Sequence, residues 1–90
     1  MSLTFRPIAS SSLGNSYIVD DGKTKLLIEC GLKFRDIKIA LDFQTSKIAG
    51  CLLSHEHDDH SHSIRDVLKT GISVYTSKGT QEALGINHHR

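Results

Sequence analysis

The residues with the clearest chemical potential form the segment His55-Glu56-His57-Asp58-Asp59-His60. His55 and His57 are two positions apart, so on an extended backbone their side chains point to the same side. Asp59 and His60 follow where a predicted strand gives way to a loop, which lets the chain fold two more side chains back toward the first pair. Imidazole nitrogens and carboxylate oxygens are the ligands that a borderline metal such as zinc prefers. The spacing therefore predicts a metal site.

The pattern His-x-His-x-Asp-His, preceded by an apolar run and Ser54, resembles the signature of the metallo-β-lactamase superfamily. The resemblance implies that His55 and His57 bind one metal and that Asp59 and His60 bind a second. It also implies a catalytic role for Asp59, which would orient a metal-activated water. Zinc in two sites is the cofactor that the family suggests, with manganese or iron as alternatives.

The resemblance extends toward the N-terminus. A serine-rich loop over residues 10–16, a strand, an Asp-Gly turn and the segment 27–31 are similar to the opening hairpin of small bacterial metal-dependent hydrolases. Glu29 stands where the family usually has aspartate. We expect Glu29 to hydrogen-bond the backbone or a ligand imidazole, because metal-binding histidines usually need such a partner. Ser54 is expected, like Glu29, to support the metal ligands without binding the metal itself. Many relatives have a glycine near residues 61–63, where this chain has Ser-His-Ser.

Hydrophobic periodicity and turn residues predict eight elements around the motif. Residues 48–53 are nearly all apolar, which indicates a central strand covered on both faces. Pro7 lacks an N–H donor and indicates an edge strand, while residues 21–22 are typical of a hairpin turn. The strands are expected over residues 3–9, 17–19, 25–30, 48–53 and 72–76, and the helices over residues 33–43, 61–69 and 77–84.

This order indicates an α/β fold in one small domain. The resemblance makes residues 1–90 a partial domain, namely the N-terminal half of an αβ/βα sandwich with helices packed on a mixed sheet. The formal net charge is +1 and no Lys/Arg run is present, which argues against a dedicated nucleic-acid surface but not against a nucleic-acid substrate held at the metal site. No segment is apolar enough to cross a bilayer and no leader is recognisable, so we expect a cytoplasmic protein without a membrane partner.

Other chemically capable side chains have simpler interpretations. Cys30 and Cys51 lie in apolar runs and are expected to be small buried hydrophobic residues rather than metal or redox groups. His62 lies outside the signature and is read as a surface residue, with a substrate contact as the alternative. The remaining assignments are solvent exposure for Glu56 and Asp58, turn formation rather than substrate binding for Ser11 and Asn15, and a frayed end for His88 and His89.

Two functions are compatible with these features. The first is a metal-dependent hydrolase acting through a metal-activated water, on a small molecule or a nucleic acid, with the opening loop favouring a phosphodiester substrate. The matched residues supply two ligands per metal, whereas catalytic zinc generally has three protein ligands and water. The missing ligands would then come from a second copy, another chain or a longer parent. The alternative is a non-catalytic half-domain that serves as a metal-binding or assembly module. An exposed sheet edge predicts self-association or binding of a complementing C-terminal half.

Overall fold

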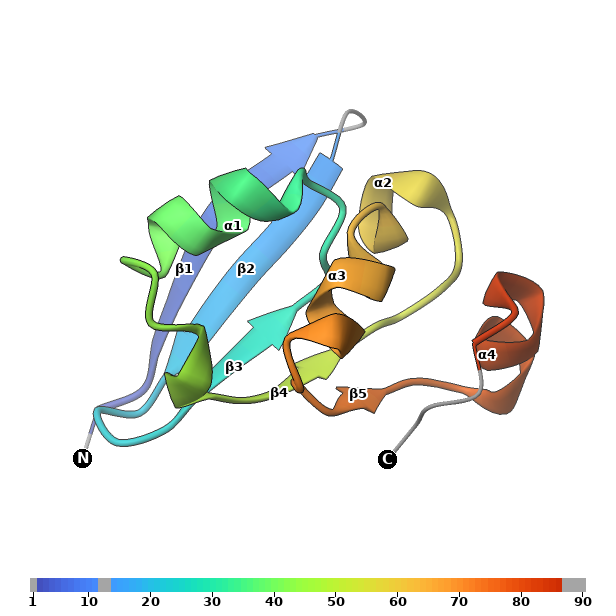
Figure 1. Cartoon of the computed structure of the whole chain (residues 1–90). Helices are drawn as coiled ribbons and strands as arrows, with labels where there is room; N and C mark the ends of the chain where they lie inside the picture. The colour runs from blue at the N-terminus through green and yellow to red at the C-terminus, as the bar shows by residue number, and fades with distance from the viewer. Residues whose placement is uncertain (1, 12–13, 87–90) are drawn as a thin grey trace.

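The strands follow one another in sequence order across a single sheet. In the computed structural model, which describes residues 2–11 and 14–86, the order is β1-β2-β3-β4-β5 (Figure 1). Strands β1 (Thr4–Ser11), β2 (Gly14–Asp20) and β3 (Lys25–Ile28) pair antiparallel. Strands β4 (Ile48–Leu52) and β5 (Val74–Tyr75) continue the sheet in parallel. The sheet is therefore mixed, and the predicted α/β class is confirmed.

The hairpin of β2 and β3 turns where the sequence predicts it. The Asp21 carboxylate accepts hydrogen bonds from the backbone N–H groups of Lys23 and Thr24, at 2.9 and 2.7 Å. These bonds favour the charged form and lower the pKa of Asp21. Pro7 lies in β1, which is an edge strand as predicted, and the pairing with β2 is irregular between Pro7 and Ala9.

The predicted loop over residues 10–16 is mostly strand. Ser10 pairs with Asn15 and Ser11 pairs with Gly14, so β1 and β2 continue toward each other across this segment. Residues 12 and 13 lie outside the described residues. Small polar side chains in the segment suggested a loop, but pairing with the neighbouring strand satisfies the backbone groups and overrides that local preference.

The helices connect the parallel strands. Helix α1 (Phe34–Ala40) and a 3₁₀ turn (Thr45–Lys47) lie between β3 and β4, and α2 (Asp58–Ser61) and α3 (Ile64–Lys69) lie between β4 and β5. Helix α4 (Lys78–Leu84) follows β5. The Ser77 hydroxyl caps α4 by accepting from Thr80 N–H at 3.1 Å, as the sequence indicated.

The element boundaries that differ from prediction include those of two predicted helices and one strand. The predicted helix over residues 61–69 is two helices, and the first begins at Asp58, inside the expected metal loop. Strand β3 ends before Glu29 because that residue has φ of 63°, which a strand does not accommodate. The helix expected over residues 33–43 ends at Ala40, and Asp42 and Phe43 adopt positive φ.

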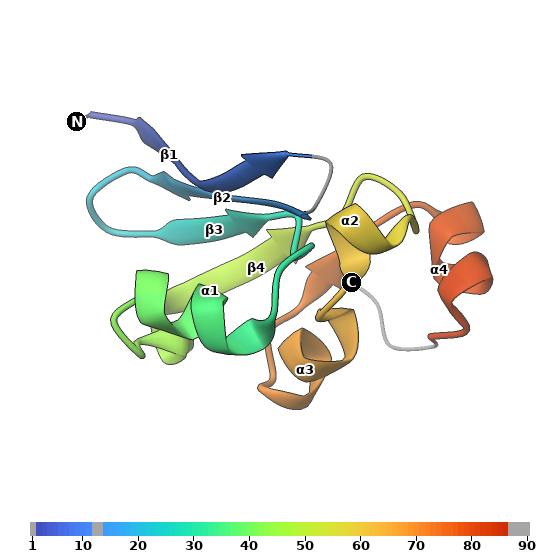
Figure 2. The same ribbon diagram turned by 90° about the horizontal axis from the view of Figure 1, so that it is seen from above.

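The helices α1 and α3 pack on one face of the sheet (Figure 2). That face carries the core, and Leu27, Cys51 and Val74 on three adjacent strands are fully buried. Cys30 and Cys51 are both buried free cysteines, which confirms their predicted place in the core. A hydrogen bond with Cys30, together with burial, raises the pKa of the Cys51 thiol.

The opposite face of the sheet is largely open. Phe5, Leu52 and Tyr75 are 61%, 41% and 43% exposed, and the strand register places them on the side away from Leu27 and Cys51. The prediction that the strand over residues 48–53 is covered on both faces was therefore wrong. Its apolar composition reflects one face in the core and one face carrying exposed apolar side chains.

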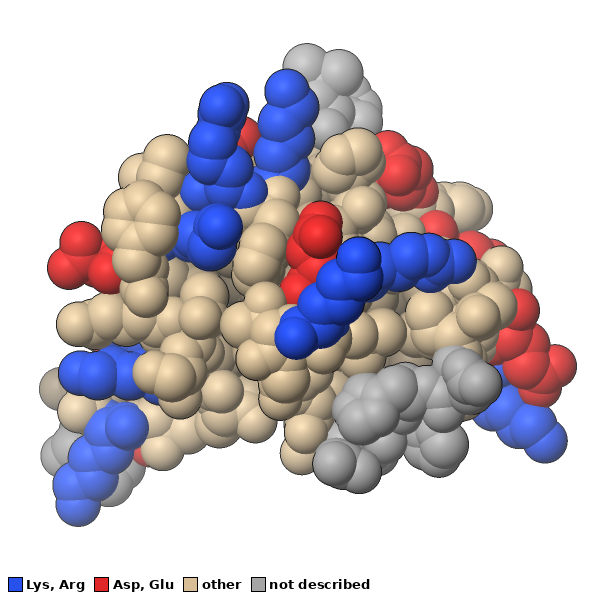
Figure 3. All heavy atoms as spheres, in the orientation of Figure 1, with Lys and Arg blue, Asp and Glu red and all other residues tan. Residues whose placement is uncertain are grey.

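The charged side chains form no continuous basic stripe on the face shown in Figure 3, where Lys and Arg lie in separate groups with Asp and Glu among them. Within the described residues, no helix has the length and apolar character needed to cross a membrane.

The one-sided core predicts unequal effects of two leucine substitutions on adjacent strands. Leu27→Ala removes a fully buried side chain, so we expect the free energy of unfolding to fall by about 2–5 kcal/mol. Leu52→Ala is the matched control and should cost less than about 1 kcal/mol, because Leu52 is 41% exposed. Urea denaturation followed by circular dichroism measures both. Equal losses would contradict the one-sided core.

Candidate metal centre

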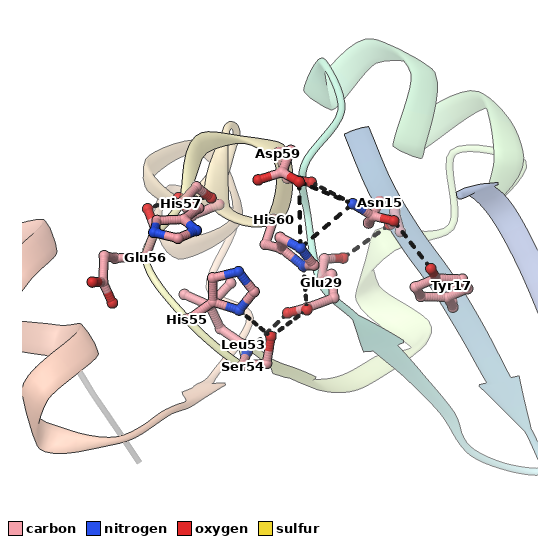
Figure 4. A network of polar contacts seen from close by, with 12 residues as sticks. Asn15, Tyr17, Glu29, Leu53, Ser54, His55, Glu56, His57, Asp59 and His60 are labelled. Carbon is pink, nitrogen blue, oxygen red and sulfur yellow. Dashed lines mark hydrogen bonds and ion pairs between the residues drawn. The ribbon is translucent and has the colours of Figure 1, made fainter. Parts of the chain in front are cut away.

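The candidate centre lies where β3 and β4 end. These strands are parallel, so the residues that follow them meet at one edge of the sheet. Glu29 follows β3, Ser54 and His55 follow β4, and α2 carries Asp59 and His60 (Figure 4).

The four predicted metal ligands converge there. The potential ligand atoms of His55, His57 and Asp59 all lie within 4.8 Å of one another. His60 Nε2 lies 3.5 Å from Asp59 Oδ2, and the ring centroids of His55 and His60 are 3.9 Å apart. Imidazoles and a carboxylate gathered at this spacing match the donors that zinc or iron takes in proteins. The residues therefore fit a metal centre, and their assignment as ligands stays a prediction.

Glu29 is the buried anion of this cluster, with 5% of its surface exposed. Its Oε1 accepts the backbone N–H of Ser54 at 2.8 Å, and its Oε2 accepts the Ser54 hydroxyl and lies 2.5 Å from His60 Nδ1. Both kinds of contact expected for Glu29, with backbone and with an imidazole, are present. When Nδ1–H of His60 donates to Glu29, the lone pair of Nε2 is left facing Asp59.

Glu29 also falls in a second group, with His55 and His60, whose potential ligand atoms lie within 4.8 Å of one another. Its two oxygens already accept from the two donors of Ser54 and from His60. We therefore assign Glu29 to the support of the imidazoles rather than to metal coordination.

Ser54 connects Glu29 to His55. Its hydroxyl lies 2.9 Å from His55 Nδ1 while it also contacts the Glu29 carboxylate. A hydroxyl has one hydrogen, and a carboxylate is the stronger acceptor. We therefore assign the hydroxyl hydrogen to Glu29, so that His55 Nδ1–H donates to Ser54 and His55 Nε2 remains available. One carboxylate thus orients two imidazoles, directly for His60 and through Ser54 for His55.

Backbone contacts hold α2 against the chain that follows β3. Cys30 N–H donates to the His60 carbonyl at 2.7 Å, and Gly31 N–H donates to the Asn15 carbonyl at 2.8 Å. The Asp59 carbonyl lies so close to Gly31 that a Cβ at that glycine would be 1.8 Å from the Asp59 oxygen. Glycine is therefore required at residue 31 for space.

Asn15 is the site residue that the sequence interpretation missed. It lies in β2 rather than forming a turn, and its side-chain Nδ2 is 3.2 Å from the Asp59 carbonyl, 3.4 Å from Asp59 Oδ2 and 3.5 Å from His60 Nε2. Tyr17 donates its hydroxyl hydrogen to Asn15 Oδ1 at 3.2 Å. The serine-glycine-asparagine character of this segment was the available signal, but the contact between residues 15 and 59 depends on the sheet.

The other polar residues near the motif lie outward. Glu56, Asp58 and His62 are exposed, as the sequence indicated for each of them. His62 Nδ1 lies 3.2 Å from both oxygens of the Asp58 carboxylate. Ser11 lies in β1 rather than in a turn, and His88 and His89 fall outside the described residues.

Comparisons with known proteins address the family and the fold. A family model described as the metallo-beta-lactamase superfamily matches residues 11–83. The exodeoxyribonuclease WalJ of Streptococcus pneumoniae, in strains D39 and R6, is 31% identical over 81 residues, which cover 86% of this chain and 30% of the relative. The chain therefore spans less than a third of the length of these curated relatives.

Solved structures show the same fold. The B3 metallo-beta-lactamase BLEG-1 has a TM-score of 0.72 at 23% identity, with 90% of this chain and 40% of that chain covered. The metallo-beta-lactamase fold protein YhfI of Bacillus subtilis has a TM-score of 0.70 at 20% identity, with 90% and 39% covered. A chemotaxis sensor, ODP, described as a peroxy diiron species, has a TM-score of 0.71 at 22% identity, with 84% and 34% covered.

The close approach at Gly31 predicts a large effect of a single methyl group. Gly31→Ala places a Cβ against the Asp59 carbonyl, which is backbone and cannot rotate away, so we expect a loss of about 3 kcal/mol or more in unfolding free energy. Gly79→Ala, in α4 with open space around it, is the matched control and should be neutral or stabilising. Thermal and urea unfolding of the two variants test this. A Gly31→Ala protein as stable as the parent would refute the close packing of α2 against Gly31.

Proposed function

Because this chain belongs to the metallo-β-lactamase superfamily, we propose that it takes part in the metal-dependent hydrolysis of phosphodiester bonds by a metal-activated water. The observation that carries the proposal is the convergence of His55, His57, Asp59 and His60 beside the ends of β3 and β4. The superfamily is metal-dependent, and the donors gathered here suit such chemistry.

The chain's own residues would prepare the centre for the reaction. Glu29 and Ser54 contact the Nδ1 atoms of His60 and His55, which leaves both Nε2 atoms available, and His60 Nε2 lies beside Asp59. Zinc bound by these side chains would supply a hydroxide at neutral pH without a strong base. The Asp59 carboxylate would accept a hydrogen bond from the attacking water and hold it in line with the scissile bond. Zinc is our first choice of metal, and iron and manganese are tested beside it.

A phosphodiester substrate is supported by the relative named an exodeoxyribonuclease, which shares 31% identity over 81 residues. Over the face shown in Figure 3, Lys and Arg do not form a continuous stripe, so on that face binding of a nucleic acid would depend on the metal centre more than on a basic groove. The cytoplasmic location expected from the sequence belongs to the same proposal.

We propose, from the ligand count, that the centre is completed from elsewhere. The signature supplies two ligands to each of two metals, whereas catalytic zinc generally has three protein ligands and water. The chain spans 30% of its curated relatives, and its sheet exposes Phe5, Leu52 and Tyr75 on the face without helices. We propose that a complementing polypeptide, equivalent to the part of the relatives that this chain does not span, packs on that face and brings the remaining ligands.

The low ligand count also supports a second candidate, a non-catalytic module that binds metal or assembles with a partner. Zinc binding without hydrolysis, with the complementing polypeptide present, would favour this module over the enzyme. Hydrolysis that requires both parts would exclude it.

Substitutions at the signature test the metal-dependent function. We expect His55→Ala and Asp59→Asn to weaken zinc binding at least about tenfold, since even the partners that orient ligands contribute about that much. His62→Ala is the matched control outside the signature and should bind zinc like the parent. Calorimetric titration with zinc, iron and manganese gives the affinities, and bis(p-nitrophenyl) phosphate hydrolysis reports activity. Zinc affinity unchanged in both signature variants would refute the centre.

The exposed apolar face predicts self-association of the chain in the absence of its complement. Large exposed apolar patches favour association, so we expect the mean mass in light scattering to rise with protein concentration. Leu52→Lys should return the mass toward that of a monomer, because it places a charge on β4, an interior strand of the sheet, where its side chain lies on this face. A strictly monomeric parent at high concentration would count against the prediction.

A further inference from the structure

Asn15 and Tyr17 form a pair of residues beside the predicted ligands Asp59 and His60. The Asn15 side chain is on β2, forty-four residues before Asp59, and its Nδ2 is within 3.5 Å of three acceptors: the Asp59 carbonyl, Asp59 Oδ2 and His60 Nε2. No motif in the sequence joins these positions. Figure 4 shows Asn15 on the side of His60 opposite to His57.

The orientation of the Asn15 amide is fixed from both ends. The Asp59 carbonyl can only accept a hydrogen bond, so the Asn15 atom that faces it must be the NH₂ group. The Tyr17 hydroxyl donates to Asn15 Oδ1 at 3.2 Å, which agrees with the same orientation. The Tyr17 ring is itself held by a stacked contact with Phe5, with ring centroids 5.2 Å apart. The amide therefore presents its hydrogens toward Asp59.

The main chain of Asn15 is also held close to α2, beside the contact of its side chain with Asp59. Gly31 N–H donates to the Asn15 carbonyl at 2.8 Å, and Gly31 is the residue on which the Asp59 carbonyl rests. Asn15 thus contacts Gly31, against which α2 packs, through its main chain, and it contacts Asp59 through its side chain.

We infer that Asn15, oriented by Tyr17, is a positioning residue that holds Asp59, through its carbonyl and its carboxylate, in place beside His60 for metal binding. Glu29 orients His60 through its Nδ1, and Asn15 contacts Asp59, the other predicted ligand of the same metal. The inference rests on the proposed function, because it concerns a metal bound by Asp59 and His60. It assigns Asn15 and Tyr17 to the metal expected at Asp59 and His60. The other metal, expected at His55 and His57, is not assigned to them.

Zinc titration of the ¹⁵N-histidine-labelled chain, followed by NMR of the imidazole nitrogens, tests this assignment residue by residue. Asn15→Leu keeps the approximate volume and removes the donor, so the zinc concentration needed to shift His60 should rise about 10- to 100-fold. The response of His57 should stay within about twofold of the parent. Tyr17→Phe keeps the ring that stacks on Phe5 and should shift the His60 response in the same direction by a smaller factor.

Tyr75→Phe is the matched control for Tyr17→Phe, because Tyr75 is an exposed tyrosine on β5 away from this pair. Urea denaturation establishes that each variant is folded, and Tyr17→Phe still tests the inference should Asn15→Leu not fold. An unchanged His60 response, or equal weakening at His60 and His57, would overturn the positioning role while leaving the proposed function intact. A parent chain whose His60 does not respond to zinc would overturn the proposed function and this inference together.

Discussion

The buried carboxylate of Glu29 is the interaction on which the candidate centre depends. A charged group with 5% exposure is stable only when its oxygens are hydrogen-bonded, and here the donors come from two separate segments, Ser54 after β4 and His60 on α2. Glu29 reaches them because it leaves β3 with φ of 63°, which turns its side chain out of the strand direction. Its N–H donates to Leu52 at 2.8 Å and its carbonyl accepts from the Ser16 hydroxyl at 2.9 Å, so the backbone is held in this conformation.

The parallel pairing of β3 and β4 makes this arrangement possible. Parallel strands end at the same edge of a sheet, and the chain after each of them supplies one part of the site. Helix α2 then brings its side chains onto that edge, and the Cys30 N–H and the absent side chain of Gly31 fix its position. The main-chain contacts therefore place α2, and the side chains of Glu29 and Ser54 orient the imidazoles.

Local patterns in the sequence were sufficient for the motif and for most of the elements. The two-residue spacing of His55 and His57, the turn at Asp21 and the separation of strands and helices are properties of short segments, so they can be read without the fold. The four residues of α2 could not be read in this way, because so short a helix is stabilised by its contacts with Cys30 and Gly31 more than by its own propensity.

Long-range features were the ones that sequence reasoning missed. Residues 15 and 59 meet only because β2 lies beside β3, so the role of Asn15 could not follow from its neighbours. Likewise, the apolar run over residues 48–53 is equally consistent with a strand covered on two faces and with one whose second face awaits a partner. Which of these holds depends on where the helices pack, and they pack on one face.

The open face of the sheet and the candidate centre are physically connected through Tyr17. Its register on β2 places the ring on the side of the sheet that bears Phe5 and Leu52, while its hydroxyl reaches Asn15 at the edge of the centre. A polypeptide packed on that face would restrict the stacked rings of Phe5 and Tyr17, and with them the amide that contacts Asp59. The residues proposed to position the second pair of predicted ligands would thus be affected by covering the sheet. Completion of the fold and organisation of the centre would then stabilise each other, because both act through the same side chains.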